Sequence, residues 1–473
     1  MTSPQSGEER LSAAANLLNA NRLAEAEDVL QKLVIDHAGS GTAWFLLGMV
    51  CGRQKRNQDA LRALLKAEAL GTQQPALPSL LGLLCFRVGR FDQAVAYYRA
   101  ALKQAPADTG IAVQLADVLM NTGVLDEAEA LFTLVRKAKP DDVAANVGLA
   151  LILATKGRDE EALAHIAAAH RAAPQSELVR AWSQDLPLLA RLRTLFTLST
   201  EGPLPSPYTD MLRTALASFG GEQPVVMLYH VDQEGPHPFQ SLQQNAEIDY
   251  LGITRIAVEA ARKHWHGCRV VMITDPHSPM PLGDRVDAVV RLPVRREWIM
   301  YERLRVQRAL AACGRFSGPM LFIDTDIVLN RDFSALFQHD FDVALSWRIN
   351  PLMPINGGMI VGRAGANLVR FFDRNIALYE ALADCDFVRD RYGFDVRAFR
   401  GGQLAHGAYV GWDCPLGRPA RRAIDDVDVA FFAADDINFT YASETDPEVL
   451  ASKLAIHFKG GPAKAHAQPM QGH

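Results

Sequence analysis

The stretch from residue 82 to residue 106, GLLCFRVGRFDQAVAYYRAALKQAP, decides the fold of the first half of the chain. Its small residues, its central glycine and its closing proline recur along the chain with a step of 34 residues. The recurring positions are Ala26, Ala60, Ala94, Ala128 and Ala162; Gly89, Gly123 and Gly157; Pro106, Pro140 and Pro174; and Ala14, Gly48, Gly82, Ala116 and Ala150. Several anchors in one register predict an array of internal repeats.

Each repeat is expected to be a pair of amphipathic helices. The small residues are expected where the two helices cross closely, since a larger side chain would push the axes apart. The glycines follow the first helix, where a left-handed backbone costs glycine little, and the prolines end the second helix. One pair cannot bury its apolar face alone, so successive pairs stack into a superhelix.

This pattern resembles the tetratricopeptide (TPR) family over residues 8–176, in about five repeats. The resemblance implies an all-α TPR superhelix that binds peptides or other proteins in its groove. A dimerisation device or a rigid spacer is the alternative, and dimerisation can coexist with binding. We therefore expect a protein acceptor or partner at the array, with a homodimer as the second expectation.

The composition excludes several classes of protein. A chain of 473 residues is too long for one ordinary core and predicts roughly two or three domains. The net charge of −5 gives no sign of a nucleic-acid-binding surface. No apolar run is long enough to span a bilayer, and the N-terminus lacks a secretory pattern, so we expect a cytoplasmic protein. The cysteines form no CxxC pair, which argues against a zinc site or a disulfide framework.

The repeats give way to a different kind of sequence after Pro174. Residues 177–220 are expected to hold capping helices and a linker, because residues 199–207 (STEGPLPSP) have the composition of a linker. A second domain is expected over residues 221–464. Residues 465–473 are expected to be a disordered tail.

Short apolar runs alternate with helical patterns in this second domain. Runs typical of buried strands cover residues 225–230, 269–274, 286–292 and 320–323, and helices are expected over residues 245–263 and 298–312. The alternation predicts an α/β domain with a mainly parallel sheet. Ligands bind such sheets at the carboxyl ends of the strands, where Asp275, Asp324 and Asp326 are expected.

Asp324 and Asp326 directly follow an apolar strand. Two carboxylates there are costly unless a cation neutralises them, and hard oxygen ligands favour Mg²⁺ or Mn²⁺. Such a cation also binds a diphosphate and screens the charge on a departing nucleoside diphosphate. Two other interpretations stay open. One is a turn with two solvated aspartates, and the other is the motif of haloacid-dehalogenase-like phosphatases, in which Asp324 would be the nucleophile.

Further motifs surround this pair of aspartates in a fixed order. YERLR (301–305) precedes the pair, while NGG (356–358), GQL (402–404) and HFKG (457–460) follow it. The order resembles GT-A glycosyltransferases, particularly the retaining group that includes glycogenin and bacterial lipopolysaccharide glycosyltransferases, over residues 223–463. The resemblance implies an α/β, Rossmann-like GT-A fold that transfers a sugar from a nucleoside-diphosphate-sugar donor.

The resemblance also implies roles for individual residues. Asp324, Asp326 and His457 would hold the Mn²⁺ or Mg²⁺ ion, with the two aspartates also acting in catalysis. Asn356 would hydrogen-bond sugar or acceptor hydroxyls, and Gln403 would lie near the anomeric carbon. The residues that would contact the donor nucleotide, its diphosphate or its sugar are Asp275, Arg303, Arg305, Gly357, Gly358, Lys459 and Gly460.

Several of these assignments have structural alternatives that stay open. His457 could be an ordinary buried histidine, the NGG run could be a hairpin turn, and only one of Arg303 and Arg305 can easily face the site. Gly402 stands where the family has an acidic residue. Retaining chemistry is slightly favoured, but inverting chemistry stays open. An inverting enzyme needs a carboxylate base, for which the chain offers Asp395, Asp413, Asp435 and Asp436.

The sequence thus predicts a metal-dependent glycosyltransferase whose TPR array holds a protein acceptor or a protein that presents one. The alternatives are a non-catalytic TPR adaptor with a degenerate transferase domain, and a phosphatase. Nothing in the sequence identifies the sugar, the nucleotide or the acceptor.

Overall fold

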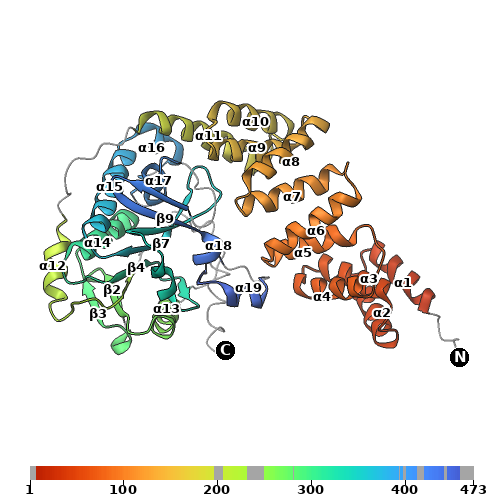
Figure 1. Cartoon of the computed structure of the whole chain (residues 1–473), viewed down its shortest axis with the longest axis horizontal. Coiled ribbons are helices and arrows are strands. Elements are labelled where there is room, and N and C mark those ends of the chain that lie inside the picture. Colours follow the sequence, from red (N-terminus) through yellow and green to blue (C-terminus); the bar gives the residue numbers. More distant parts are fainter. Residues whose placement is uncertain are drawn as a thin grey trace. The chain divides into compact units, whose positions relative to one another are not determined.

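The computed structural model describes residues 7–196, 206–231, 250–280, 282–393, 395–397, 401–412, 420–440 and 445–458. The chain divides into two compact units. The first consists of residues 1–148 with 444–450, and the second of residues 149–443 with 451–473. Figure 1 shows paired helices in the N-terminal region and a layered arrangement of helices and strands in the C-terminal region.

Paired helices form the first unit and continue into the second. They are α1 (Gly7–Asn19), α2 (Leu23–Asp36), α3 (Gly41–Arg53), α4 (Asn57–Ala69), α5 (Leu77–Arg87), α6 (Phe91–Gln104), α7 (Thr109–Asn121), α8 (Leu125–Ala138), α9 (Val143–Thr155) and α10 (Asp159–Ala172). Within the first unit, α1 packs on α2, α3 on α4, α5 on α6 and α7 on α8. The predicted array of helix pairs is therefore confirmed.

The repeated small residues act as the sequence predicts. A Cβ added at Gly48 would lie 2.5 Å from Leu64 Cδ2 on the second helix of the pair, so the two helices meet closely only because this position is small. Gly89 and Gly123 have φ of 84° and 81° in the turn between the helices. Lys55 takes the same left-handed region, with φ of 63°, where its repeat lacks the glycine.

The last helices of the array belong to the second compact unit. Its boundary at residue 148 lies N-terminal to the predicted end of the repeats at residue 176. Helix α11 (Glu177–Leu195) explains the difference, because its side chains bond to C-terminal residues of the same unit. Arg391 pairs with Asp185 at 2.6 Å, and Arg193 donates a hydrogen bond of 3.2 Å to the Trp412 carbonyl oxygen. The capping helix thus also anchors the α/β region.

An eight-stranded sheet organises the second unit, in the order β3-β2-β1-β4-β7-β6-β9-β8. Its strands are β1 (Val225–Tyr229), β2 (Arg269–Thr274), β3 (Ala288–Arg291), β4 (Pro319–Ile323), β6 (Val343–Trp347), β7 (Ile355–Arg363), β8 (Ala420–Ile424) and β9 (Val427–Ala433). The four expected strands are confirmed as β1, β2, β3 and β4. The sheet is mixed: four of its pairings are parallel, while β7 runs antiparallel to both β4 and β6 and β8 runs antiparallel to β9.

Helices cover both faces of this sheet (Figure 1). The helices and 3₁₀ turns of the unit are α12 (Tyr208–Ala215), η2 (Gly283–Arg285), η3 (Arg296–Trp298), α13 (Tyr250–His264), α14 (Ile299–Ala312), η4 (Phe333–Gln338), α15 (Ala366–Ala383), α16 (Asp386–Tyr392), α17 (Gly401–Tyr409), α18 (Ala434–Ile437) and α19 (Pro447–Ser452), the last shared with the first unit. On one face Leu228 and Leu321 pack with Ala257 of α13. On the other, the Phe322 ring meets Phe372 of α15, since alternate strand residues point to opposite faces.

The strand order contains a point at which the chain changes direction across the sheet. β1 pairs with β2 on one side and with β4 on the other, and all three run parallel. The connection after β1 therefore leads to β2 on one side of β1, whereas β4 lies on its other side. In open α/β sheets the carboxyl ends of the strands at such a point flank the usual ligand crevice.

A second, three-stranded sheet continues from the end of β4. It consists of β10 (Phe439–Thr440), β11 (Ala455–His457) and β5 (Ile327–Leu329), with β11 in the middle. Its strands bring the chain's C-terminal part to the residues that follow β4. Among the described helices, none is both long and apolar enough to cross a membrane.

Candidate functional site

The turn from β4 to β5 places Asp324 and Asp326 at the carboxyl end of the large sheet. The amide of Ile327 donates to the Asp324 carbonyl oxygen at 3.1 Å and closes the turn. Strand β11 pairs antiparallel with β5, so that His457 lies opposite Ile327. The amide of Phe458 also donates to the Asp326 carbonyl oxygen at 2.9 Å. Backbone pairing thus brings His457 beside the two aspartates, although they are far apart in the sequence.

The three side chains converge. One ligand atom each from Asp324, Asp326 and His457 lies within 4.8 Å of the other two. His457 Nε2 is 3.3 Å from Asp326 Oδ1, and Nδ1 of the same ring has no hydrogen-bond partner among the described residues. Two carboxylates and an imidazole are a donor set that suits Mn²⁺ or Mg²⁺.

Gly358 makes room for this cluster. A Cβ at this position would lie 2.9 Å from Asp324 Oδ2 and 3.3 Å from His457 Cε1. The neighbouring Gly357 is equally restricted, because its Cβ would lie 3.0 Å from His406 Cδ2. Both glycines therefore allow the backbone of β7 to pass directly under the site.

The NGG run is a strand irregularity and not a hairpin turn. It lies within β7, where the pairing with β6 jumps from Leu345 opposite Ile360 to Ser346 opposite Asn356. The buried Asn356 accepts a hydrogen bond from the Gly358 amide through Oδ1 at 3.3 Å. Its side chain holds the irregular backbone at the site, which replaces the hairpin alternative.

Arg303 and Arg305 lie on α14 but face different surroundings, as residues two apart on a helix must. The Arg303 guanidinium pairs with Asp324 and donates to the Gly357 carbonyl oxygen at 3.3 Å. Arg305 pairs instead with the buried Glu302 at 3.1 Å and lies over the Tyr208 ring. Arg303 therefore lies at the candidate site, whereas the described contacts of Arg305 are those of an ion pair, and its expected ligand contact stays a prediction.

Asp275 also has its contacts elsewhere. Its carboxylate accepts hydrogen bonds from the Ser278 amide and hydroxyl, both at 2.8 Å, and from Arg296 at 3.0 Å. Burial by itself raises the pKa of Asp275, but these bonds outweigh it and hold the pKa well below its ordinary value. The carboxylate anchors the turn after β2, and the expected contact between Asp275 and the nucleotide stays a prediction.

Helix α17 adds a residue that the sequence did not single out. His406 lies one turn after Gln403 and is buried, and its ring stacks on Phe371. Its Nδ1 lies 2.8 Å from Asn375 Oδ1, while Asn375 Nδ2 donates to the Phe371 carbonyl oxygen at 2.8 Å. Because the amide oxygen accepts, Nδ1 carries the proton and Nε2 is left as an acceptor.

Burial and the nearby Arg303 lower the pKa of His406 to about 3, so the imidazole is neutral at ordinary pH. Gln403, at intermediate exposure, is on the same helical face as His406. The only sequence signal for His406 was its position three residues after the glutamine. A buried histidine on an apolar helix has no spacing that distinguishes it from a core residue.

Other predicted residues lie outside the site or outside the described residues. Lys459, Gly460 and Asp413 fall outside the described residues, as does the expected tail over residues 465–473. Asp395 accepts a hydrogen bond of 2.9 Å from the Arg397 amide and pairs with its guanidinium. Asp435 and Asp436 lie on the short helix α18. None of these observations selects a catalytic base.

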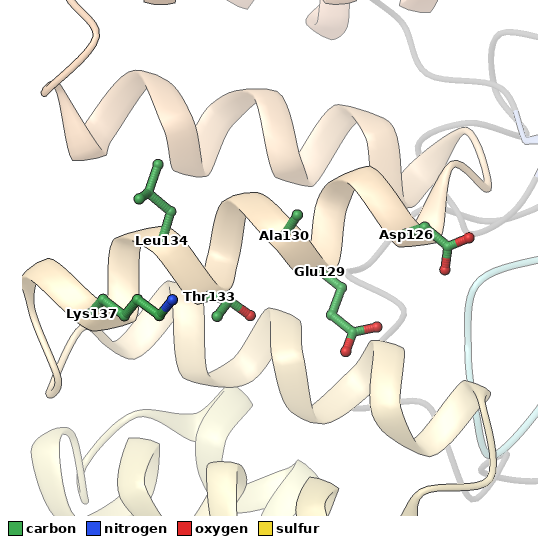
Figure 2. A pocket seen from close by; sticks show the side chains of 6 residues that line it. All are labelled: Asp126, Glu129, Ala130, Thr133, Leu134 and Lys137. Carbon is green, nitrogen blue, oxygen red and sulfur yellow. The ribbon is translucent and has the colours of Figure 1, made fainter.

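A surface hollow occurs in the first unit along α8 (Figure 2). Its lining residues are Asp126, Glu129, Ala130, Thr133, Leu134 and Lys137. All six come from one helix, with the carboxylates toward one end and the lysine at the other (Figure 2). The hollow gathers no catalytic or ligand-holding set from separate elements, unlike the cluster at β4.

Comparison with known proteins identifies the array. Models described as tetratricopeptide repeat match residues 11–75 and 86–145. The N-terminal region therefore consists of TPR repeats. No curated protein matches the chain.

Solved TPR structures are similar to part of the chain. One is YrrB, titled a TPR protein with an unusual peptide-binding site, at 24% identity and a TM-score of 0.36, covering 37% of this chain and 91% of that one. Another is MamA from AMB-1, at 20% identity and a TM-score of 0.34, covering 37% and 96%. A further MamA structure has 15% identity and a TM-score of 0.33, covering 41% and 98%.

Proposed function

We propose that the C-terminal region is a metal-dependent GT-A glycosyltransferase that moves a sugar from a nucleoside-diphosphate donor to a hydroxyl of an acceptor. The observation that carries the proposal is the convergence of Asp324, Asp326 and His457 within 4.8 Å at the end of β4. The sheet reverses its connections beside β4, where α/β proteins place their ligands.

A divalent cation held by Asp324, Asp326 and His457 would neutralise charge on the departing diphosphate. Arg303 adds a fixed positive charge beside Asp324, with its orientation set by the Gly357 carbonyl oxygen. A diphosphate needs such a cationic environment, because its negative charge increases as the glycosidic bond breaks.

The other side of the site fits a sugar. Gly357 and Gly358 let a ring approach the backbone closely, and the neutral His406 offers an acceptor nitrogen beside them. In the transfer, an acceptor hydroxyl oxygen bonds to the anomeric carbon while the bond from that carbon to the diphosphate oxygen breaks. The hydroxyl proton passes to the departing phosphate oxygen in retaining chemistry, or to a carboxylate base in inverting chemistry.

The TPR array supports a protein as acceptor, or as the partner that presents the acceptor. Stacked helical repeats provide extended surfaces for peptides and proteins. The non-catalytic adaptor and the phosphatase remain alternatives. Arg303 argues against the phosphatase, since it pairs with the carboxylate that would have to act as the nucleophile.

A thermal-stability panel tests the proposal. The full chain is melted with UDP, GDP, ADP, CDP and dTDP and their common sugar conjugates, each with and without Mn²⁺. A ligand at about 100 times its dissociation constant adds roughly 2.7 kcal/mol, which such a scan detects. We expect a Mn²⁺-dependent shift for one nucleotide family, lost in Asp326→Asn and kept in Asp340→Asn, a carboxylate that is 92% exposed. No shift for any nucleotide would favour the adaptor.

A further inference from the structure

Residues at one position in the first helix of each repeat form a row along the array. One residue of this row is charged, whereas the others are apolar. Ala15, Met49, Leu83 and Asp117 occupy the same repeat position, and Leu151 follows in the sequence at the same step. In the first unit each row member directly follows the small residue that packs against the second helix. All four are at intermediate exposure, so the row forms a partly accessible face of the array. Asp117 is its only charged member.

Apolar side chains make up part of the immediate surroundings of Asp117, beside the polar Gln114 and Asn121 at the equivalent helical spacings. Val113 and Met120 lie four residues before and three residues after it on α7, hence on the same helical face, and both are partly exposed. Leu83 and Phe86 occupy the corresponding face of α5 and are also partly exposed. A carboxylate in such a setting loses much of its hydration without a compensating contact.

No such contact is found in the described part of the chain, where the Asp117 carboxylate has neither a hydrogen bond nor an ion pair. Burial raises its pKa to about 6, with no cation to oppose the effect. Other acids of the array do have partners. Glu27 pairs with Arg56 at 2.5 Å, and Glu127 with Arg99 at 2.6 Å.

An uncompensated carboxylate costs stability, and groups that cost stability are commonly kept for binding. A divalent metal ion does not fit here, because such an ion binds several oxygen ligands and Asp117 is a single carboxylate. A primary ammonium or a guanidinium needs only one carboxylate, and the apolar residues on either side would cover the methylene stem that carries it.

We propose that the face around Asp117 binds a segment of a partner protein that presents apolar side chains and one lysine or arginine, whose cation pairs with the Asp117 carboxylate. The apolar residues supply contact area along the row, and the carboxylate fixes the register of the bound segment. This inference rests on the TPR array and is independent of the glycosyltransferase proposal.

Short synthetic peptides test this inference directly. The peptides alternate Leu, Val or Phe with Ser and carry Lys, Arg, Gln or Glu at the centre, with both ends blocked. Binding to the full chain is measured by fluorescence anisotropy. We expect the Lys and Arg peptides to bind and the Gln and Glu peptides to bind about tenfold or more weakly, as loss of a charge-assisted bond implies.

Two variants locate the binding site. Asp117→Asn keeps the shape of the side chain and should reduce binding of the Lys peptides about tenfold, to the level of the Gln peptides. Asp92→Asn removes an exposed carboxylate from α6 and should change nothing. Circular dichroism confirms that both variants fold.

Three results would overturn the proposal. The first is the absence of binding by every Lys and Arg peptide. The second is equal binding of Lys and Gln peptides, or binding that Asp117→Asn leaves unchanged. The third is self-association of the chain, detected by sedimentation and abolished in Asp117→Asn, since the occupant would then be a second copy of this chain and not a different protein.

Discussion

Asp117 in the helical array and His406 in the α/β unit are both ionisable groups that burial drives toward the neutral form. The surroundings differ. Asp117 has no described hydrogen bond, whereas Asn375 fixes the orientation and the tautomer of His406, and Arg303 adds to the shift of its pKa. His406 Nδ1 thus has its hydrogen-bond partner within the chain. The bare carboxylate of Asp117 indicates that its partner comes from outside.

The largest expected effect is a loss of Mn²⁺ affinity on substitution of Gly358, which is tightly packed against the candidate metal site. Gly358→Ala brings a Cβ to 2.9 Å from Asp324 Oδ2 and must displace that carboxylate or the nearby His457 ring. We expect the affinity for Mn²⁺ to fall about 10- to 100-fold, the usual cost of misplacing a ligand. Calorimetric titration measures it. Gly52→Ala in the array is the matched control, since its Cβ meets only Ala60 Cβ at 3.8 Å, and an unchanged affinity in Gly358→Ala would contradict the close packing.

Acid should weaken the α/β unit through His406. Its folded pKa of about 3 lies below the ordinary 6.5, so the unfolded chain takes up a proton first as the pH falls. The stability present above about pH 6.5 is therefore lost toward pH 3, by up to about 1.4 kcal/mol per pH unit. Hydrogen exchange in peptides from β1 and β4, corrected for intrinsic rates, measures this loss. His406→Gln should flatten the dependence, and an unaltered slope in that variant would refute the assignment.

Acid should have the opposite effect on the array through Asp117. Its folded pKa of about 6 lies above the ordinary 3.8, so the folded chain binds the proton more tightly. Stability falls as the pH rises from about 4 to about 6 and stays low above that range. Asp117→Asn should therefore stabilise α7 at about pH 8 and have little effect at about pH 4. Hydrogen exchange in α7 peptides measures this, and destabilisation at high pH would show that the carboxylate has an internal partner.

The smallest expected effects are changes in the free energy of unfolding at Gly48 and Gly52 of α3. Of these two glycines only Gly48 recurs in the repeat pattern. Gly52→Ala should stabilise the chain by about 0.5–1 kcal/mol, because alanine is the better helix former and the position has room. Gly48→Ala should destabilise it by about 1–3 kcal/mol, since its Cβ would overlap Leu64. Urea unfolding separates the two, and equal effects would contradict the close crossing of α3 and α4.

The sequence predicted the array and the strands well, because these depend on local patterns. Period and spacing fixed the repeats, and apolar runs fixed β1, β2 and β4. The proximity of His457 to the two aspartates required the pairing of β11 with β5, a long-range contact that no local pattern contains. Only the likeness to a family suggested it.

Three further features of the site also depend on tertiary contacts. The NGG run suggested a turn because glycine is frequent in turns, but tertiary pairing with β4 and β6 made it part of β7. Asp275 looked available for a ligand at a strand end, yet Ser278 and Arg296 bind it internally. Which arginine of α14 faces the site depends on the rotation of the helix against the sheet, which the sequence leaves open.

Metal binding at the end of β4 is the central property of the proposed glycosyltransferase. Binding of Mn²⁺ to the full chain can be followed by electron paramagnetic resonance, which detects the free ion directly. We expect one site that Asp326→Asn and His457→Ala each remove and that Asp340→Asn leaves intact. Binding that survives in both of the first two variants, or no binding by the unaltered chain, would contradict the proposed metal site and with it the glycosyltransferase assignment.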